Sequence, residues 1–190
     1  MVYRPTFRKQ LDGSRCASFN CGCASQAMAS QRFREGRDPM NHHGWPPMPS
    51  EIRNYISPNS CSGTTLQQND NAAYHLYLTN MWVRYGVPWD SFRSLIVSGR
   101  GAIVQISYSV ILGTKYAGST VFNGPHAIYV NERRATDGAY LVYDPLADGR
   151  RPGIAKGPQW WPGILLRRAA EAMPGTATGC INASFTIDTE

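Results

Sequence analysis

Residues 20–36 read NCGCASQAMASQRFREG, and this stretch has the features of one well-bounded helix. Asn20 is a residue type favoured at the N-cap, where its side chain can bind the first free amide groups. The Ala, Gln, Met and Arg residues that follow are good helix formers. Gly36 suits the position just beyond a helix. The stretch therefore predicts a helix over residues 21–35, with Cys21 in its first turn.

Apolar residues at helical spacing indicate further helices outside this stretch. Residues 69–85 are expected to form one long helix that Gly86 ends, and residues 89–98 a shorter one. The segment 37–63 is rich in Pro, Gly, His, Asn and Ser and is expected to be mostly loop. Two more short helices are expected, at residues 49–56 and 164–172.

The later half of the chain changes to the pattern of β-strands. Strands are expected over residues 102–108, 126–131 and 139–144. The last two should form a hairpin, because Asp137-Gly138 between them is a strong turn signal. Residues 180–188 are expected to form one more strand or an extended arm. Helices followed by an antiparallel sheet predict an α+β fold, with the N-terminal helices packed on the sheet.

The chain length of 190 residues suits one compact domain. We expect this domain to span residues 1–173, and residues 174–190 to form a flexible stretch and a C-terminal strand or arm. A hydrophobic fraction of 42% is ordinary for a globular protein, which argues against disorder. No metal or other cofactor is needed to explain a core of this size.

The net charge is +6, which favours anionic partners such as nucleic acid, a membrane face or a cell-wall polymer. No nucleic-acid motif is present, and no apolar run reaches the roughly 18 residues of a membrane span. The first ten residues lack the apolar core of a secretory signal. We therefore expect a protein made in the cytoplasm, which would need another route to act outside the cell.

Five cysteines are present: Cys16, Cys21, Cys23, Cys61 and Cys180. The number is odd, so at least one has no partner within the chain. The first three lie close together in the sequence, which suggests local chemistry more than a disulfide framework. Cys21 is the best placed of them, because a helix N-terminus favours the negative charge of a thiolate.

His126 is the best candidate base for such a thiolate. It opens an apolar strand directly after Gly124-Pro125, where a side chain can point into a cleft. Asp144 ends the next strand, and in a hairpin it lies at the same open end as His126, where it can orient the imidazole. Gln10 could donate its side-chain amide to an oxyanion. Taken alone, each of these residues also has an ordinary structural interpretation.

In this order the residues resemble the papain-like peptidases that process bacteriocin leaders ending in double glycine. Those proteins carry a Gln, then Cys-Gly opening a small-residue helix, then a His opening a strand, then Asp-Pro. The matching residues here are Gln10, Cys21-Gly22, His126 and Asp144-Pro145. The resemblance implies a papain-like fold, with Cys21 as nucleophile, His126 as base, Asp144 as orienting residue and Gln10 as oxyanion donor.

The nucleophile has two rivals within the same stretch. Cys16 lies six residues after Gln10, which is the spacing typical of the leader peptidases, whereas Cys21 lies further away. Cys23 also falls in the first turn of the expected helix. Cys21 is preferred because the residues after it continue into a helix as they do in the family.

Standalone chains of this type resemble bacteriophage proteins, which implies a lysin or a virion-associated peptidase acting on peptidoglycan peptides. The expected partners are therefore a peptide or peptidoglycan substrate and other virion proteins. Three alternatives remain: another cysteine hydrolase of cell walls, a non-catalytic structural virion or interaction protein that keeps the fold, and a zinc site. The zinc site would use Cys16, Cys21, Cys23, His42 and His43, although their spacing fits structural zinc poorly.

Overall fold

The computed structural model describes residues 3–14, 16–35, 47–149 and 154–186. Three helices form one half of the molecule: α1 (Cys21–Glu35), α2 (Pro49–Ile56) and α3 (Leu66–Tyr77). A small apolar core joins them and consists of Cys23, Ala27, Ile52, Ala72 and Tyr77. The bounds of α1 and α2 confirm the helices expected at residues 21–35 and 49–56.

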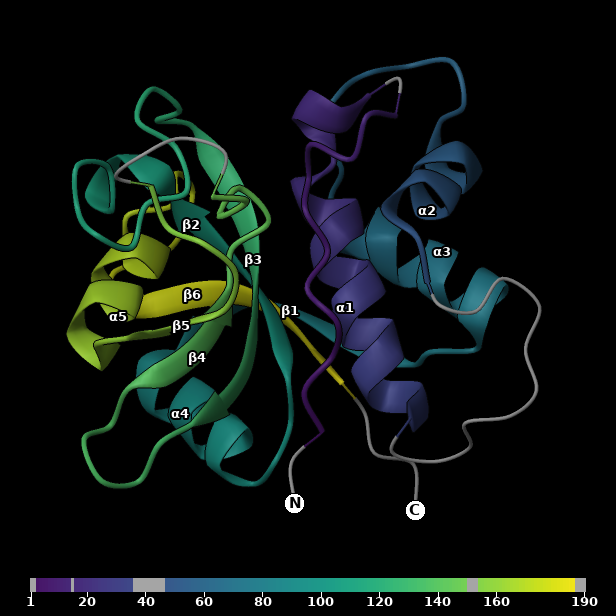
Figure 1. Ribbon diagram of the computed structural model, residues 1–190. Helices are drawn as coiled ribbons and strands as arrows, with labels where there is room; N and C mark the ends of the chain where they lie inside the picture. The colour runs from purple at the N-terminus through teal and green to yellow at the C-terminus, as the bar shows by residue number, and fades with distance from the viewer. Residues whose placement is uncertain (1–2, 15, 36–46, 150–153, 187–190) are drawn as a thin grey trace.

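The other half is a six-stranded antiparallel sheet with the order β1-β6-β2-β3-β4-β5 (Figure 1). Its strands are β1 (Met81–Pro88), β2 (Ala102–Ser107), β3 (Pro125–Arg133), β4 (Tyr140–Tyr143), β5 (Gln159–Trp161) and β6 (Cys180–Thr186). The expected hairpin is present as β3 and β4, with Gly138 at a positive φ in the turn. The final segment is thus a strand between β1 and β2; residues 187 and 188 lie outside the described residues.

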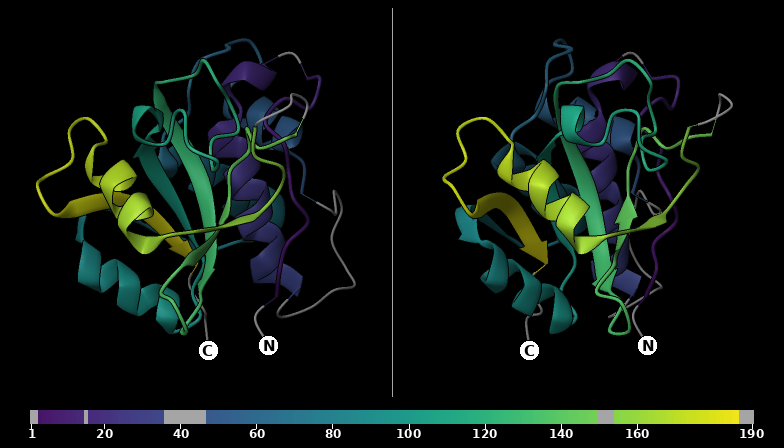
Figure 2. Two further views of the ribbon diagram at one scale, coloured as in Figure 1. Left: turned by 60° about the vertical axis from the view of Figure 1, so that its left-hand side comes forward. Right: turned by 90° about the vertical axis from the view of Figure 1, so that its left-hand side faces the viewer.

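Helices cover both faces of this sheet, as Figures 1 and 2 show. On one face lies α1, where Met28 and Ala29 pack with Ile103 and Tyr129. On the other face lie α4 (Trp89–Val97) and α5 (Gly163–Glu171), which pack on the larger apolar core of the sheet. The structure therefore confirms an α+β arrangement in which the N-terminal helices pack on an antiparallel sheet.

The prediction of one helix over residues 69–85 is wrong for the second half of this segment. The helix α3 begins at Leu66 and ends at Tyr77, and Leu78 takes a left-handed conformation with φ of 51°. The chain then extends as β1, which pairs with β6. The apolar spacing over this segment fits a helix, but hydrogen bonding to a strand about a hundred residues later decides the outcome.

A disulfide joins Cys16, before α1, to Cys61, between α2 and α3, with a Cα–Cα distance of 5.0 Å. The clustering of Cys16, Cys21 and Cys23 suggests local chemistry more than a disulfide framework, and this pairing corrects that expectation for Cys16. Cys21, Cys23 and Cys180 are free thiols. Among the described residues, no helix is long and apolar enough to cross a membrane.

Candidate active site

Cys21 is the first residue of α1 and is partly exposed. The backbone carbonyl of Asn20 accepts the N–H of Ala24 at 2.8 Å, which begins the helix where the sequence predicts. The Asn20 side chain, however, does not bind a helix amide. Its carboxamide donates to Ser14 and accepts from Arg53, so it ties the preceding turn to α2.

Arg53 holds the backbone immediately before Cys21 in place. This buried side chain donates to the Asn20 side chain at 2.8 Å, to the Phe19 carbonyl at 2.6 Å and to the Ser62 carbonyl at 2.9 Å. Burial of a cation is costly unless acceptors surround it, and here three acceptors do so. Arg53 could not be predicted as a site residue, because no local sequence pattern marks a basic residue on α2 as a partner of the turn before α1.

His126 and Asp144 meet at the open end of the hairpin, as the sequence predicts. The Nε2 atom of His126 lies 2.8 Å from Oδ1 of Asp144, and both side chains are almost completely buried. The other ring nitrogen, Nδ1, is buried, and no hydrogen bond with another described residue occupies it. Nδ1 is therefore the nitrogen that is available to the Cys21 thiol.

The helix and the sheet meet directly beside this histidine. Ser25, one turn into α1, donates its hydroxyl to the carbonyl of Ala127 at 3.1 Å, and both residues are buried. This contact fixes the first turn of α1 against the start of β3. Cys21 and His126, which belong to different halves of the molecule, are thereby brought together.

The pKa values of the two residues move in opposite directions. Burial disfavours the thiolate of Cys21, but the interaction with His126 and the backbone groups of Ala127 and Gly22 outweigh it, so the pKa of Cys21 is lowered. Burial also disfavours the imidazolium of His126, but Asp144 and Cys21 outweigh it and raise the pKa of His126 to about 9. The arrangement therefore favours a thiolate–imidazolium pair at neutral pH.

Asp144 is held by two further donors. The Tyr108 hydroxyl donates to Oδ2 of Asp144 at 2.8 Å, and the backbone N–H of Leu146 donates to Oδ1 at 2.9 Å. The rings of Tyr108 and Phe122 also pack edge-on against His126. Tyr108 was missed as a site residue, since only the folded hairpin brings its hydroxyl to the carboxylate.

Gln10 lies beside the same hairpin end, because its backbone N–H donates to the carbonyl of Pro145 at 2.8 Å. Its side-chain amide donates to the Ser18 carbonyl at 2.6 Å. An amide nitrogen carries two hydrogens, so one remains to serve an oxyanion. The oxyanion role of Gln10 stays a prediction.

The rival thiols are poorly suited to catalysis. Cys16 is engaged in the disulfide with Cys61. Cys23 is fully buried, with its sulfur 3.7 Å from Oδ1 of Asn69, and burial raises its pKa to about 11. A thiol with such a pKa is almost entirely protonated at neutral pH.

The zinc alternative is not supported by the residues that the structure describes. Its ligand Cys16 is bound in the disulfide, and the described ranges hold no group of three or more His, Cys, Asp or Glu side chains arranged for a metal. Two further proposed ligands, His42 and His43, lie outside the described residues.

Comparisons with known proteins place the fold. No protein-family model and no curated protein matches this sequence. Among solved structures, the chain is similar to a candidate C39-like peptidase from Bacillus anthracis, with a TM-score of 0.61 and 12% identity over 97% of this chain and 95% of that one. It is also similar to UfSP from C. elegans, with a TM-score of 0.49 and 10% identity over 96% of this chain and 33% of that one. The chain therefore has an α+β fold of the papain-like peptidase type.

Proposed function

We propose that this chain is a cysteine peptidase that hydrolyses amide bonds with Cys21 as nucleophile, His126 as proton carrier and Asp144 as orienting residue. The observation that carries the proposal is the buried 2.8 Å contact between His126 Nε2 and Asp144. It leaves Nδ1 for Cys21, whose pKa is lowered in consequence. Nucleophile, base and orienting group thus come together in the order that thiol catalysis requires.

In this mechanism the Cys21 thiolate adds to the carbonyl carbon of the substrate amide. Gln10 and the amide groups at the start of α1 would stabilise the oxygen as it becomes negative. When the C–N bond breaks, His126 gives its proton to the leaving amine, and a thioester remains on Cys21. A water molecule then gives a proton to His126 and attacks the thioester, which releases the acid and restores the thiol.

The proposed substrate is the peptide part of bacterial peptidoglycan, and the proposed setting is a phage lysin or a virion-associated peptidase acting at the host cell wall. The support is chemical: a net charge of +6 suits an anionic wall. In this setting the other partners would be neighbouring virion proteins.

The test combines thiol reactivity with hydrolysis. The protein is treated with iodoacetamide at pH 6, the modified residue is identified by mass spectrometry, and release of peptides from purified peptidoglycan is measured. We expect rapid modification at Cys21 alone, and complete loss of hydrolysis in Cys21→Ala. The matched control is Cys180→Ala, which removes another free, partly exposed thiol.

Two results would contradict the proposal. Slow modification of every thiol in the folded protein would favour the alternative of a non-catalytic structural virion or interaction protein. Hydrolysis that persists in Cys21→Ala would remove Cys21 from the reaction. Rapid modification without release from peptidoglycan would keep the chemistry and reject only the proposed substrate.

A further inference from the structure

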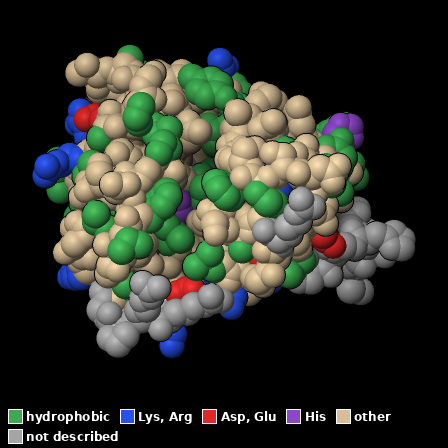
Figure 3. Space-filling model, turned by 90° about the horizontal axis from the view of Figure 1, so that it is seen from above, with side chains coloured by type: hydrophobic (Ala, Val, Ile, Leu, Met, Phe, Trp, Pro, Cys, Tyr) green, Lys and Arg blue, Asp and Glu red, His purple; other side chains and the backbone are tan. Residues whose placement is uncertain are grey.

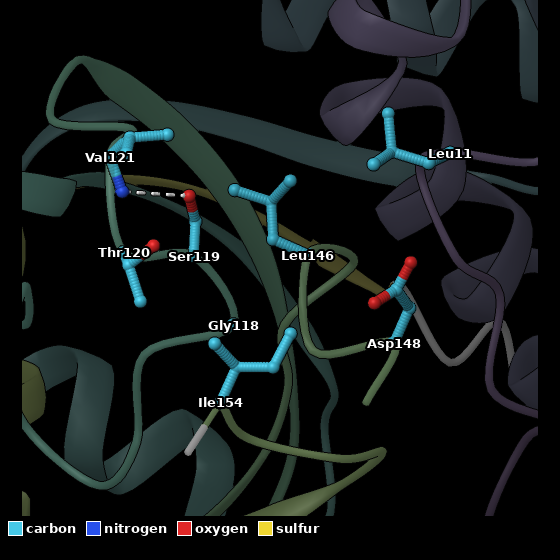
Figure 4. Close-up of a pocket in the computed structure, with 8 residues that line it drawn as sticks. All are labelled: Leu11, Gly118, Ser119, Thr120, Val121, Leu146, Asp148 and Ile154. Carbon is cyan, nitrogen blue, oxygen red and sulfur yellow. Dashed lines mark hydrogen bonds between the residues drawn. The ribbon is translucent and has the colours of Figure 1, made fainter. Parts of the chain in front are cut away.

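A pocket of about 240 Å³ is lined in part by Leu146, two residues after Asp144 (Figure 4). In Figure 4, Leu146 lies between Leu11 on one side and Ser119 and Val121 on the other, and Ile154 points up toward the same space. The side chains and backbone that line it come from the N-terminal segment, from the loop before β3 and from the segment after β4. They are Leu11, Gly118, Ser119, Thr120, Val121, Leu146, Asp148 and Ile154.

Short hydrogen bonds connect the walls of this pocket to Asp144. The backbone N–H of Gly118 donates to the Tyr108 hydroxyl at 2.6 Å, and that hydroxyl donates to Asp144. The backbone N–H of Leu146 donates to the other oxygen of the same carboxylate. A Cβ on Gly118 would lie 2.3 Å from the backbone nitrogen of Ala147, so the two walls touch here. These hydrogen bonds connect the pocket to the orienting group of the site.

Leu11 and Ile154 are joined to the site through their chain neighbours. Leu11 follows Gln10, whose backbone N–H donates to the carbonyl of Pro145. Ile154 precedes Ala155, whose N–H donates to the Ala117 carbonyl at 2.9 Å. The pocket therefore keeps its position relative to Asp144. Viewed from above in Figure 3, hydrophobic side chains gather along the groove between the two halves of the molecule.

The position of the pocket assigns it to one side of the scissile bond. The imidazole of His126 contacts Asp144 through Nε2 and leaves Nδ1 for Cys21, so Asp144 lies on the opposite side of the ring from the nitrogen that serves the thiol. The acyl group stays on the sulfur after the amide breaks, whereas the amine departs toward the imidazole that protonates it. A pocket that begins two residues after Asp144 is therefore on the side of the departing amine.

We propose that this pocket binds the aliphatic side chain of the residue that follows the scissile bond. The proposal rests on the proposed peptidase function. Four of the lining side chains are aliphatic: Leu11, Val121, Leu146 and Ile154. The volume suits one side chain, since pockets for whole drug-sized ligands measure about 300 Å³ or more. The carboxylate of Asp148 on the wall disfavours an acidic side chain.

Acyl transfer tests this pocket without knowledge of the natural substrate. An N-acylglycine p-nitrophenyl ester acylates Cys21 and releases p-nitrophenol. The thioester then reacts either with water or with an added amine. When an amine attacks, the C–S bond breaks, a C–N bond forms, and the amine proton returns through His126 to the sulfur. The amines compared are the amides of leucine, alanine and glutamate.

We expect leucine amide to trap the acyl group at least about ten-fold more efficiently than alanine amide, because a side chain larger by several carbons fills the pocket. Glutamate amide should be the poorest acceptor. In Ile154→Ala the preference for leucine amide over alanine amide should fall several-fold. In Thr120→Trp this preference should be lost, because a large ring is placed at the exposed rim of the pocket. The matched control is Ile164→Ala on the exposed side of α5.

The release of p-nitrophenol separates the two proposals. The pocket proposal would be overturned if p-nitrophenol is released normally but the three amides trap the acyl group equally. It would also be overturned if both pocket variants keep the full preference for leucine amide. Either result would leave the peptidase proposal intact. No release in a protein whose Cys21 is also unreactive toward iodoacetamide would overturn both. Preference for an aliphatic residue in the acyl portion, without preference among the amines, would assign the pocket to the other side and contradict the inference.

Discussion

At the scale of single residues, the interaction between Cys21 and His126 sets the pH range of the reaction. The pKa of Cys21 is lowered and that of His126 is raised to about 9, which widens the pH range in which both groups are charged. Because the folded pKa of His126 lies above its ordinary value, the imidazolium is fully present at neutral pH and is lost as pH rises through about 9. The leaving amine then has no proton donor.

The first prediction is that kcat/KM falls as pH rises through about 9, whereas iodoacetamide modification of Cys21 does not fall with it. In His126→Ala, modification of Cys21 should require a higher pH, since an isolated cysteine thiol has a pKa of about 8.5. Both profiles are measured on the same preparations. A His126→Ala protein that is modified at pH 6 as fast as the parent would show that the imidazole does not lower the Cys21 pKa.

The second prediction concerns Asp144. In Asp144→Asn the negative charge that raises the pKa of His126 is absent, so the alkaline fall of kcat/KM should move to lower pH. The rate should decrease less than in Cys21→Ala or His126→Ala, because the thiol and the imidazole remain. The measurement is a full pH profile of each variant. An unchanged profile would remove Asp144 from the catalytic group.

At the scale of elements, the first turn of α1 is packed so tightly against α3 that Gly22 leaves no room for a side chain. A Cβ at this position would lie 2.5 Å from both the Asn69 side-chain nitrogen and the Thr64 hydroxyl. These two atoms are hydrogen-bonded to each other at 2.8 Å. The contact fixes the turn that carries Cys21.

The third prediction is that Gly22→Ala lowers the free energy of unfolding by about 1–3 kcal/mol, which is typical of overpacking. It should also slow the modification of Cys21, because the turn must shift. Urea denaturation and iodoacetamide kinetics measure the two effects. Gly63→Ala is the control, since a Cβ there meets nothing within 4 Å. Equal stability of the two variants would contradict the tight packing at Gly22.

The elements near the site were predictable from local signals, and the rest depended on distant partners. Residues 126–131 and 139–144 are largely apolar runs on either side of a strong turn, so the hairpin and the meeting of His126 with Asp144 followed from the sequence. By contrast, β1 is a strand because β6 pairs with it, and β5 is only three residues long. No local pattern specifies either one.

The partners that support the site were hidden for the same reason. The contacts of Arg53 with Asn20 and of Tyr108 with Asp144 join segments 33 and 36 residues apart. The pairing of Cys16 with Cys61 spans 45 residues. Residue type alone does not select such partners, because many side chains of the same chemistry are available until the chain folds.

At the scale of the whole molecule, the candidate active site is assembled from two halves. Cys21 belongs to the three-helix half, and His126 and Asp144 belong to the sheet. The packing of α1 on the sheet, through Met28 and Tyr129, keeps these residues together. The disulfide contributes within the helical half, where it closes a loop that contains α1 and α2.

The fourth prediction is that replacing both Cys16 and Cys61 by Ser lowers the free energy of unfolding by roughly 2–4 kcal/mol, as expected for a loop of this length. Modification of Cys21 should persist at temperatures where the variant stays folded, because the thiol and the imidazole are both unchanged. Thermal and urea denaturation provide the measurement. A variant as stable as the parent would show that the bridge does not restrain the unfolded chain.

The bridge between Cys16 and Cys61 also limits the redox conditions under which the protein can be active. Cys21 must be reduced to act, and as a thiolate it is the sulfur most open to conversion to sulfenic acid. Cys16 and Cys61 must stay oxidised to keep the stability that the bridge adds to the helical half. At a temperature where the protein without the bridge unfolds, turnover should therefore pass through a maximum as dithiothreitol is increased: too little leaves the nucleophile oxidised, and too much opens the bridge.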